Sequence, residues 1–369
     1  MNRDESVAIV GGGLSSLVAY ATLRYGGLEP AEIAVFGDAA DPASTFRRQA
    51  EAIRQRTMRS ESDGHCLPTS FPGLAVREAR RRRSIVPLVR SVCDRYRPPL
   101  ELFLEHVEDV RRRSGWDESF RAHRVERVGA VDGGFALEGH GVFRHVLLAT
   151  GHAGLALPDE LADDMRVVHA YEPHEYAEEV TVVGAGMAAA TEWLNALAAG
   201  SRVISVRRRE PIRRPLNVER AFFTRRGLAR FQRSGRTERV AMLRRFNEPS
   251  YPPGRAWDEP LECAAAAGRF RIEPSVNGSP QVICATGFAR GWQHDPLLAE
   301  LVRTAGLDTE LGWIVVADDC TVRELTDETR TLALAGVSAQ WAYPAADTLV
   351  GAKYAARGFL RRVRACRTR

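Results

Sequence analysis

The chain has 369 residues, of which 44% are hydrophobic and 27% are charged, and its formal net charge at pH 7 is +5. This composition excludes a disordered or fibrous chain and fits a globular protein large enough for two domains. No apolar run is long enough to cross a bilayer, so we expect no membrane partner. The 52 basic residues nearly balance the 47 acidic ones, so we expect no nucleic-acid partner either.

The start of the chain and its cysteines bear on the cellular compartment. Residues 1–6 are polar and lead at once into a strand, so we expect no signal peptide and a cytoplasmic protein. The six cysteines are scattered and form no C-x-x-C pair. This pattern argues against a disulfide framework, a zinc site and a redox dithiol, so we expect no metal.

The first predicted element is a buried strand, residues 7–10, that runs into a glycine turn starting at Gly11 and then into a helix over 14–25. The first glycine makes the turn, and Gly13 lets a pyrophosphate approach the backbone. The helix N-terminus then offers free N–H groups to the anion. Ser16 replaces the third glycine of this dinucleotide-binding pattern. The residues expected to contact a first nucleotide here are Gly11, Gly13, Leu14, Ser15 and Ser16.

The second predicted strand covers residues 33–36 and ends at Gly37. In dinucleotide-binding folds an acidic residue at this strand end binds the ribose hydroxyls. Asp38 follows one residue later, which makes it the candidate ribose ligand.

The middle of the first half has a long polar stretch, residues 41–72, which we expect to be irregular. A polar segment of this length within a compact domain is typical of a functional loop. Two helices are predicted over 85–96 and 100–113. Short strands follow at the positions 123–130, 135–138 and 142–149.

A second strand–turn–helix unit repeats the first, with a strand at 180–183, a glycine turn at 184–186 and a helix at 188–197. The next strand, 203–206, leads directly into three arginines that start at Arg207. An acidic residue at this place selects NAD, whereas a basic group accommodates the 2′-phosphate of NADP, so the arginines favour NADPH. The expected contacts of the second nucleotide are Gly184, Gly186, Met187, Ala188, Arg207 and Arg208.

Two buried strands end in the same small residues, at Thr150-Gly151 and at Thr286-Gly287, on either side of the second glycine turn. A last strand is predicted near 332–336, and a helix follows from about 345 to 364. Together these elements predict an α/β fold of two Rossmann-like dinucleotide-binding domains, one inserted into the other. The expected division is 1–160 with 285–369 for the first domain and 161–284 for the inserted one.

In this order the elements resemble two-domain flavoproteins, most closely NADPH-dependent flavin monooxygenases such as flavin-containing monooxygenases and ornithine or lysine N-hydroxylases. The segment Ala285-Thr286-Gly287-Phe288 is similar to their Ala-Thr-Gly-aromatic motif. The resemblance implies FAD in the first domain and NADPH in the inserted one. It also implies cofactor contacts from Met58, Thr150, Gly151, Thr286, Gly287 and Gly336.

The resemblance implies that NADPH reduces the flavin, that dioxygen adds at C4a to give a hydroperoxide, and that a small nucleophile is oxygenated at nitrogen or sulfur. Arg59, Ser60 and His65 are the expected catalytic groups near the flavin ring. The partners would be a small-molecule substrate and dioxygen, with a homo-oligomer possible by analogy. Two alternatives stay open: a reductase that passes electrons to a quinone, a protein or a small disulfide, and a protein in which FAD is a structural or sensing ligand.

Overall fold

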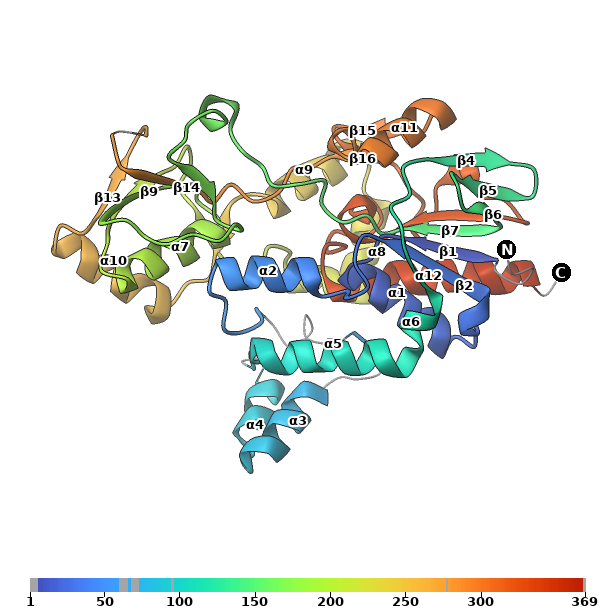
Figure 1. Cartoon of the computed structure of the whole chain (residues 1–369), viewed down its shortest axis with the longest axis horizontal. Coiled ribbons are helices and arrows are strands. Elements are labelled where there is room, and N and C mark those ends of the chain that lie inside the picture. The colour runs from blue at the N-terminus through green and yellow to red at the C-terminus, as the bar shows by residue number, and fades with distance from the viewer. Residues whose placement is uncertain (1–5, 60–65, 68–72, 94–95, 277, 368–369) are drawn as a thin grey trace.

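The computed structural model describes residues 6–59, 66–67, 73–93, 96–276 and 278–367, which contain two separate five-stranded sheets (Figure 1). Hydrogen-bonded neighbours in both of these sheets run parallel. Parallel strands need crossover connections, which are usually helices, and such sheets are covered on both faces. This architecture confirms the predicted α/β class with two Rossmann-like units.

The first sheet has the strand order β17-β7-β1-β2-β3. Every residue of its central strand, β1, is buried, because α1 and α12 lie side by side under the sheet and a small antiparallel sheet covers it from above (Figure 1). The elements of this unit are β1 (Val7–Val10), α1 (Leu14–Tyr25), β2 (Ile33–Gly37), β3 (Phe120–Ala122), β4 (Val128–Val131), β5 (Gly134–Leu137), β6 (Gly141–Phe143), β7 (His145–Leu148), β17 (Thr331–Leu334) and α12 (Leu349–Arg367).

The second sheet has the order β13-β10-β9-β14-β8, and all its strands come from the part of the chain between β7 and β17. Its helices α7 and α10 pack together on one face of the sheet (Figure 1). The elements are β8 (Val167–His169), β9 (Glu179–Val183), α7 (Met187–Ala198), β10 (Arg202–Val206), α10 (Arg255–Ala266), β13 (Phe270–Glu273) and β14 (Gln281–Cys284).

A helical layer and several short elements complete the fold. The helices α3 and α4 form a hairpin that projects from α5 (Figure 1). The remaining elements are α2 (Ser44–Ala52), α3 (Gly73–Arg82), α4 (Val86–Val92), α5 (Leu100–Ser114), α6 (Trp116–Ser119), β11 (Ile212–Arg213), α8 (Arg225–Arg233), α9 (Arg236–Phe246), β12 (Ser250–Tyr251), α11 (Pro296–Ala305), β15 (Thr309–Glu310) and β16 (Trp313–Ile314).

The helices α8 and α9 lie in sequence between strands of the second sheet but pack in the core of the first unit. Phe231 of α8 and Leu243 of α9 are fully buried in the same hydrophobic cluster as Phe359 of α12. Aromatic burial of this kind supplies a large share of the packing energy of a core. The segment therefore bridges the two units.

The expectation of an irregular segment over 41–72 was wrong for its first part, because residues 44–52 form α2. The buried side of this helix presents Ala50 and Ala52, and the ring of Phe46 packs edge-on against Phe103 of α5 at 5.5 Å. Tertiary packing of a short amphipathic face outweighed the polar composition on which the prediction rested.

Candidate functional site

The first glycine turn connects the carboxyl end of β1 to α1. Gly11 has φ +122°, and a Cβ atom there would lie 2.2 Å from the carbonyl oxygen of Ala149 at the end of β7. Only glycine fits such an approach. In contrast, a Cβ at Gly13 would meet no atom within 4 Å, and no side chain caps the first turn of α1. The turn therefore leaves an open cradle at a helix N-terminus, which is a natural site for a phosphate.

Three of the other residues predicted for the first nucleotide lie beside this cradle. Thr150 and Gly151 follow Ala149 at the end of β7, which pairs with β1, and a Cβ at Gly336 would lie 3.4 Å from the Ser15 hydroxyl. The Thr150 hydroxyl, however, donates to Asp295 Oδ2 at 2.6 Å. The donor of its side chain is therefore engaged by the N-cap residue of α11, which leaves the hydroxyl oxygen as an acceptor and the backbone for a ligand.

The end of β2 explains why the acidic ribose ligand is absent from its usual place. A Cβ at Gly37 would lie 2.5 Å from Gly12 Cα, so the strand end touches the glycine turn and leaves no room for a side chain. Asp38 is exposed and lies 3.7 Å from Arg124 Nη1. Asp38 remains a prediction as ribose ligand, with a neighbouring cation that competes for it.

The second glycine turn, between β9 and α7, reproduces this geometry. Gly184 has φ +139°, and a Cβ there would lie 2.5 Å from the carbonyl oxygen of Ala285 at the end of β14. A Cβ at Gly186 would meet nothing nearer than Pro249 at 3.9 Å. Met187 is the first residue of α7, which has no side-chain cap. The chain thus contains two matched anion cradles, each at the carboxyl edge of a parallel sheet.

The three arginines after β10 differ in their exposure and contacts. Arg207 pairs with Glu210 at 2.9 Å and its guanidinium lies 6.0 Å from the centre of the Trp193 ring, so its side chain is mostly buried. Arg208 and Arg209 are exposed. The sequence prediction named Arg207 and Arg208 but missed Arg209, which lines a cavity described below. Its place in the same run was the signal for including it.

Two of the three predicted catalytic residues, Ser60 and His65, lie outside the described residues. The third, Arg59, donates from Nε to the Pro215 carbonyl at 3.1 Å and from Nη1 to Asn217 Oδ1, also at 3.1 Å. This side chain therefore ties the first unit to the segment that bridges the units. Met58 is buried in the core of the first unit.

The two segments that follow the Thr-Gly strand ends, 154–156 and 287–289, run antiparallel beside each other. Ala156 N donates to the Gly287 carbonyl and Ala289 N to the Gly154 carbonyl, both at 2.9 Å. The Thr286 hydroxyl also donates to the Ala156 carbonyl. These bonds fix the position of one sheet relative to the other.

A stack of three rings lies on the same linkers. The Phe288 ring is stacked between His152 at 4.4 Å and Tyr171 at 5.0 Å, with interplanar angles of 12° and 13°. Burial is the largest cause that lowers the pKa of His152, to about 4, and the Arg290 charge adds to it. His152 is therefore neutral at physiological pH.

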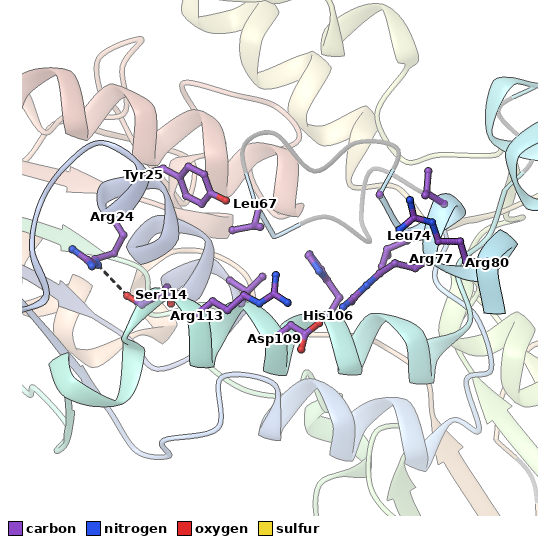
Figure 2. A pocket seen from close by; sticks show the side chains of 13 residues that line it. Arg24, Tyr25, Leu67, Leu74, Arg77, Arg80, His106, Asp109, Arg113 and Ser114 are labelled. Carbon is purple, nitrogen blue, oxygen red and sulfur yellow. Dashed lines mark hydrogen bonds and ion pairs between the residues drawn. The ribbon is translucent and has the colours of Figure 1, made fainter.

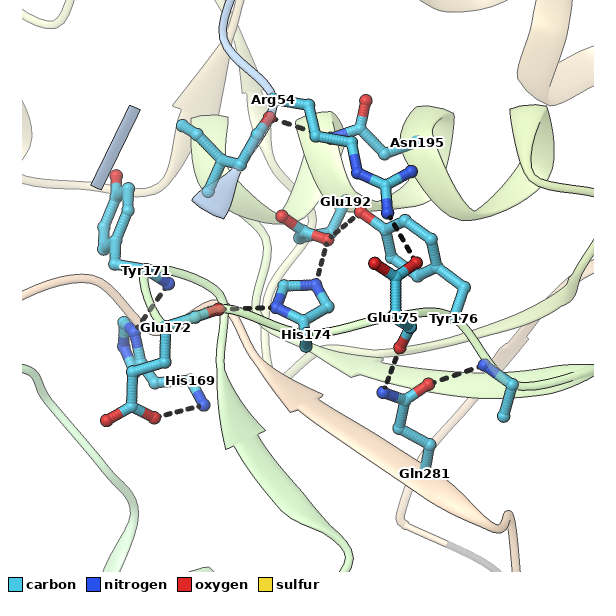
Figure 3. Close-up of polar contacts among 12 residues, drawn as sticks. Arg54, His169, Tyr171, Glu172, His174, Glu175, Tyr176, Glu192, Asn195 and Gln281 are labelled. Carbon is cyan, nitrogen blue, oxygen red and sulfur yellow. Dashed lines mark hydrogen bonds and ion pairs between the residues drawn. The ribbon is translucent and has the colours of Figure 1, made fainter. Parts of the chain in front are cut away.

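The end of α2 contacts the second unit through a group of polar residues that we call the latch: Arg54, His174, Glu175, Tyr176, Glu192 and Asn195 (Figure 3). Asn195 on α7 donates to the carbonyl of Ile53 at 2.9 Å. Arg54 pairs with Glu175 at 3.2 Å and lies 4.6 Å from the centre of the Tyr176 ring. These contacts come from both units.

Behind these contacts lies a fully buried carboxylate, Glu192. It accepts hydrogen bonds from the Tyr176 hydroxyl at 2.7 Å and from His174 Nε2 at 3.2 Å (Figure 3). Burial lowers the pKa of His174, but the bonds to Glu192 and to the Glu172 carbonyl outweigh it and raise the pKa above the ordinary value. Protonated His174 is thus favoured beside the buried Glu192 carboxylate.

A cavity of about 570 Å³ lies where the two units meet. It includes Gly151 next to the first cradle and Arg209 next to the second. This is the place where the reactive ends of two dinucleotides and a small molecule could meet. Other residues that line it are Arg244, Glu248, Arg290, Trp292, Trp313 and Gln340.

A second cavity, of about 680 Å³, lies among the C-terminal end of α1, α3 and α5 (Figure 2). His106 accepts a hydrogen bond from Cys66 N at 3.2 Å, and burial lowers the pKa of His106 to about 4. Arg77 pairs with Asp109 across this cavity (Figure 2). None of the predicted site residues that the structure describes lines it.

Among the residues that the structure describes, no three histidine, cysteine or acidic side chains gather as a metal site would require. All six cysteines are free thiols, and burial raises the pKa of Cys66 to about 12 and that of Cys284 to about 11. In the same residues no helix combines the length and apolar character of a membrane span.

No protein-family model and no curated protein matched the chain. Solved structures matched over almost its whole length. Ornithine hydroxylase from Pseudomonas aeruginosa has 17% identity and a TM-score of 0.69, with 97% of this chain and 99% of that chain covered. Ornithine N-hydroxylase from Kutzneria sp. 744, solved with reduced FAD, NADP⁺ and L-ornithine, has 15% identity and a TM-score of 0.74, with 98% and 99% covered.

The same fold also occurs in a reductase. Bacillithiol disulfide reductase from Bacillus cereus has 16% identity and a TM-score of 0.60, with 98% of this chain and 99% of that chain covered. At such identities the likeness concerns the fold, and one fold supports different reactions. The chain therefore has the full-length, two-unit fold of the flavin-dependent ornithine hydroxylases, and the predicted resemblance in fold is confirmed.

Proposed function

We propose that this protein is an FAD- and NADPH-dependent monooxygenase that oxygenates a small nucleophilic substrate at nitrogen or sulfur. The observation that carries the proposal is the pair of matched glycine cradles, at Gly11–Gly13 and Gly184–Gly186, on two sheets that meet at one cavity. The full-length likeness to ornithine hydroxylases that use this fold supports the same reaction class.

The residues present fit both cofactors. The open space at Gly13 and the uncapped start of α1 suit the FAD pyrophosphate, and Gly186 with the start of α7 suits that of NADPH. Arg208 and Arg209 are the exposed cations for the 2′-phosphate. The chemistry that these cofactors supply when bound is hydride transfer followed by activation of dioxygen.

The protein's own part is to orient and to exclude water. The antiparallel linkers at Gly154 and Gly287 hold the two cradles at a fixed separation. The tryptophans Trp292 and Trp313 give the cavity apolar walls, which limit the access of water to the reacting groups. Arg59, Ser60 and His65 remain our candidates for groups beside the flavin ring.

The domain division and the cellular setting are part of the same proposal. We keep 1–160 with 285–369 as the FAD domain and 161–284 as the NADPH domain, supported by the strands of each sheet falling within one of these ranges, although α8 and α9 of the second range pack in the core of the first unit. We also retain the expectation that the protein is a cytoplasmic enzyme whose partners are a small-molecule substrate and dioxygen. A homo-oligomer stays possible by analogy with the fold.

The test is a reaction of the FAD-loaded protein with NADPH, dioxygen and a panel of amines and thioethers. We expect NADPH oxidation to be accompanied by a product that is heavier by one oxygen atom, detected by mass spectrometry with ¹⁸O₂. Release of all reducing equivalents as hydrogen peroxide with every compound would contradict the proposal.

The alternative is a reductase, which the likeness to bacillithiol disulfide reductase favours. In that case NADPH would be consumed under argon in the presence of a quinone or a small disulfide. The six cysteines form no C-x-x-C pair, so a redox dithiol would have to come from the acceptor.

A further inference from the structure

We propose that the cavity between the two units selects an anionic substrate, a small molecule with a carboxylate and an apolar body, rather than a diamino acid. This inference rests on the proposed function, because it assigns that cavity to the substrate. It departs from ornithine, which is the ligand of the Kutzneria structure.

The side chains that line the cavity include several positive charges. Three guanidinium groups contribute to it: Arg209 after β10, Arg244 on α9 and Arg290 on the linker after β14. Arg244 has no ion-pair partner among the described residues, and Arg290 donates a hydrogen bond to the neutral side chain of Asn247. Asp347 acts on Arg290 only at longer range. Uncompensated guanidinium groups of this kind bind carboxylates well.

Two carboxylates, Asp295 and Glu248, line the cavity together with the three arginines. Asp295 accepts hydrogen bonds from Thr150 and from the backbone of Leu297 and Leu298, so it is already engaged. Glu248 is the other carboxylate in the lining of the described residues. His152 is neutral at physiological pH. With the oxygens of Asp295 already hydrogen-bonded, Glu248 is the carboxylate left to meet an ammonium group, whereas two guanidinium groups, Arg244 and Arg290, are left to meet a carboxylate.

The walls of the cavity define the rest of the ligand. Trp292 and Trp313 line it together with Leu298 and Ile314. Trp313 is held by a hydrogen bond of 3.4 Å from Nε1 to Gln340 Oε1, which leaves its ring faces for packing. Aromatic and aliphatic walls favour an apolar body, while a few polar groups fix its orientation.

The arginines can be assigned to substrate or to cofactor by their position. Arg209 belongs to the run after β10, where the 2′-phosphate of NADPH is expected. Arg244 and Arg290 come from different elements, α9 and a linker. These two are therefore the groups that we assign to the substrate carboxylate.

The test compares three probes that share one apolar body and differ in their polar group: 4-(methylthio)benzoate, 4-(methylthio)benzamide and 4-(methylthio)benzylamine. Their binding to the FAD-loaded protein with saturating NADP⁺ is measured by titration calorimetry at pH 7.5. We expect the benzoate to bind at least tenfold more tightly than the amide, and the amine to bind most weakly. Equal binding of all three probes would overturn the inference.

Substitutions test which arginines cause the preference for the benzoate. Arg244→Gln and the double change Arg244→Gln with Arg290→Gln should reduce the preference for the benzoate stepwise, with FAD content unchanged. Arg245→Gln is the matched control, because Arg245 pairs with Glu219 at 3.1 Å and does not line the cavity. An equal loss in the control, or a parallel loss of NADP⁺ affinity in the double variant, would refute the assignment.

These binding measurements need no turnover, so the two proposals can fail separately. Selective binding of the benzoate without any oxygenated product would leave the ligand class standing and remove the monooxygenase. An oxygenated product from the amine but not from the benzoate would support the monooxygenase and overturn the proposed ligand class.

Discussion

A substitution at Gly13 should affect FAD binding without affecting the stability of the fold. A Cβ added there meets no protein atom within 4 Å, so Gly13→Ala should fold with an unchanged Tm in the absence of cofactor. The same methyl group occupies the space that a pyrophosphate would need. We expect the FAD content of the purified variant, measured by absorbance, to fall by about tenfold or more.

Gly186→Ala is the matched change in the second cradle, where the nearest atom to an added Cβ is Pro249 Cα at 3.9 Å. This variant should keep its FAD and raise the Kd for NADPH by about tenfold or more. Loss of FAD in Gly186→Ala, or retention of FAD in Gly13→Ala, would show that the cradles are assigned to the wrong cofactors.

Two buried histidines, His106 and His145, and the half-buried His152 predict how stability depends on pH. Burial lowers the pKa of His106, His145 and His152 to about 4. Between pH 6.5 and 4 the unfolded chain therefore binds more protons than the folded one, so their contribution is complete above about pH 6.5 and is lost as the pH falls toward 4.

His145→Gln tests this relation, because His145 is 2% exposed and lies within β7. Between pH 6 and 4.5 the free energy of unfolding should fall less steeply with pH in the variant than in the wild-type protein. The difference between the two slopes should be about 1.4 kcal/mol per pH unit, because the variant takes up one proton fewer on unfolding. Urea denaturation at several pH values measures both slopes. Parallel curves for the two proteins would contradict the assigned pKa.

At the scale of elements, the latch predicts an effect on hydride transfer. Arg54 and Asn195 join the end of α2 to α7, the helix that starts at the second cradle. Because hydride transfer needs close alignment of donor and acceptor, Arg54→Ala should lower the rate constant of flavin reduction by about tenfold and leave the Kd for NADPH unchanged. Stopped-flow reduction over a range of NADPH concentrations separates the two quantities.

Arg47→Ala is the control for the latch. Arg47 also lies on α2 but pairs with Asp41 at 3.2 Å within the first unit. It should reduce the flavin at the wild-type rate. If both variants are equally slow, a general weakening of α2 and not the latch accounts for the effect.

Local patterns explain which elements could be predicted. The helix over 14–25 was predicted with its observed bounds, because a glycine start, apolar spacing and a glycine stop agree there. The two glycine turns and the Thr-Gly strand ends were also readable, since their chemistry is encoded within a few residues. The helix α2 was missed because its stability comes from contact with Phe103, far away in the sequence.

The candidate site could be predicted from the sequence less completely than the fold, for a physical reason. Its cavity is assembled from side chains such as Arg244, Arg290 and Trp313, which come from separate elements and have no common sequence motif. The same holds for the latch, where Arg54 meets Glu175 and Tyr176 only after the units pack together. Gly37 is different: the missing acid was visible in the sequence, but its cause, contact with Gly12, needed the structure.

At the scale of the whole molecule, the central claim is that two nucleotide sites on one chain cooperate in a single reaction. The linkers at Gly154 and Gly287 and the latch connect the two units, and Arg59 ties the first unit to the segment that bridges them. A protein that used FAD only as a structural or sensing ligand would not need a second matched cradle with Arg208 and Arg209 beside it.

The most direct test is anaerobic mixing of the FAD-loaded protein with NADPH and, separately, with NADH in a stopped-flow spectrometer. We predict that NADPH bleaches the flavin absorbance rapidly and that NADH does so much more slowly at the same concentration. If NADPH leaves the flavin oxidised, the two sites do not exchange a hydride and the central claim is wrong.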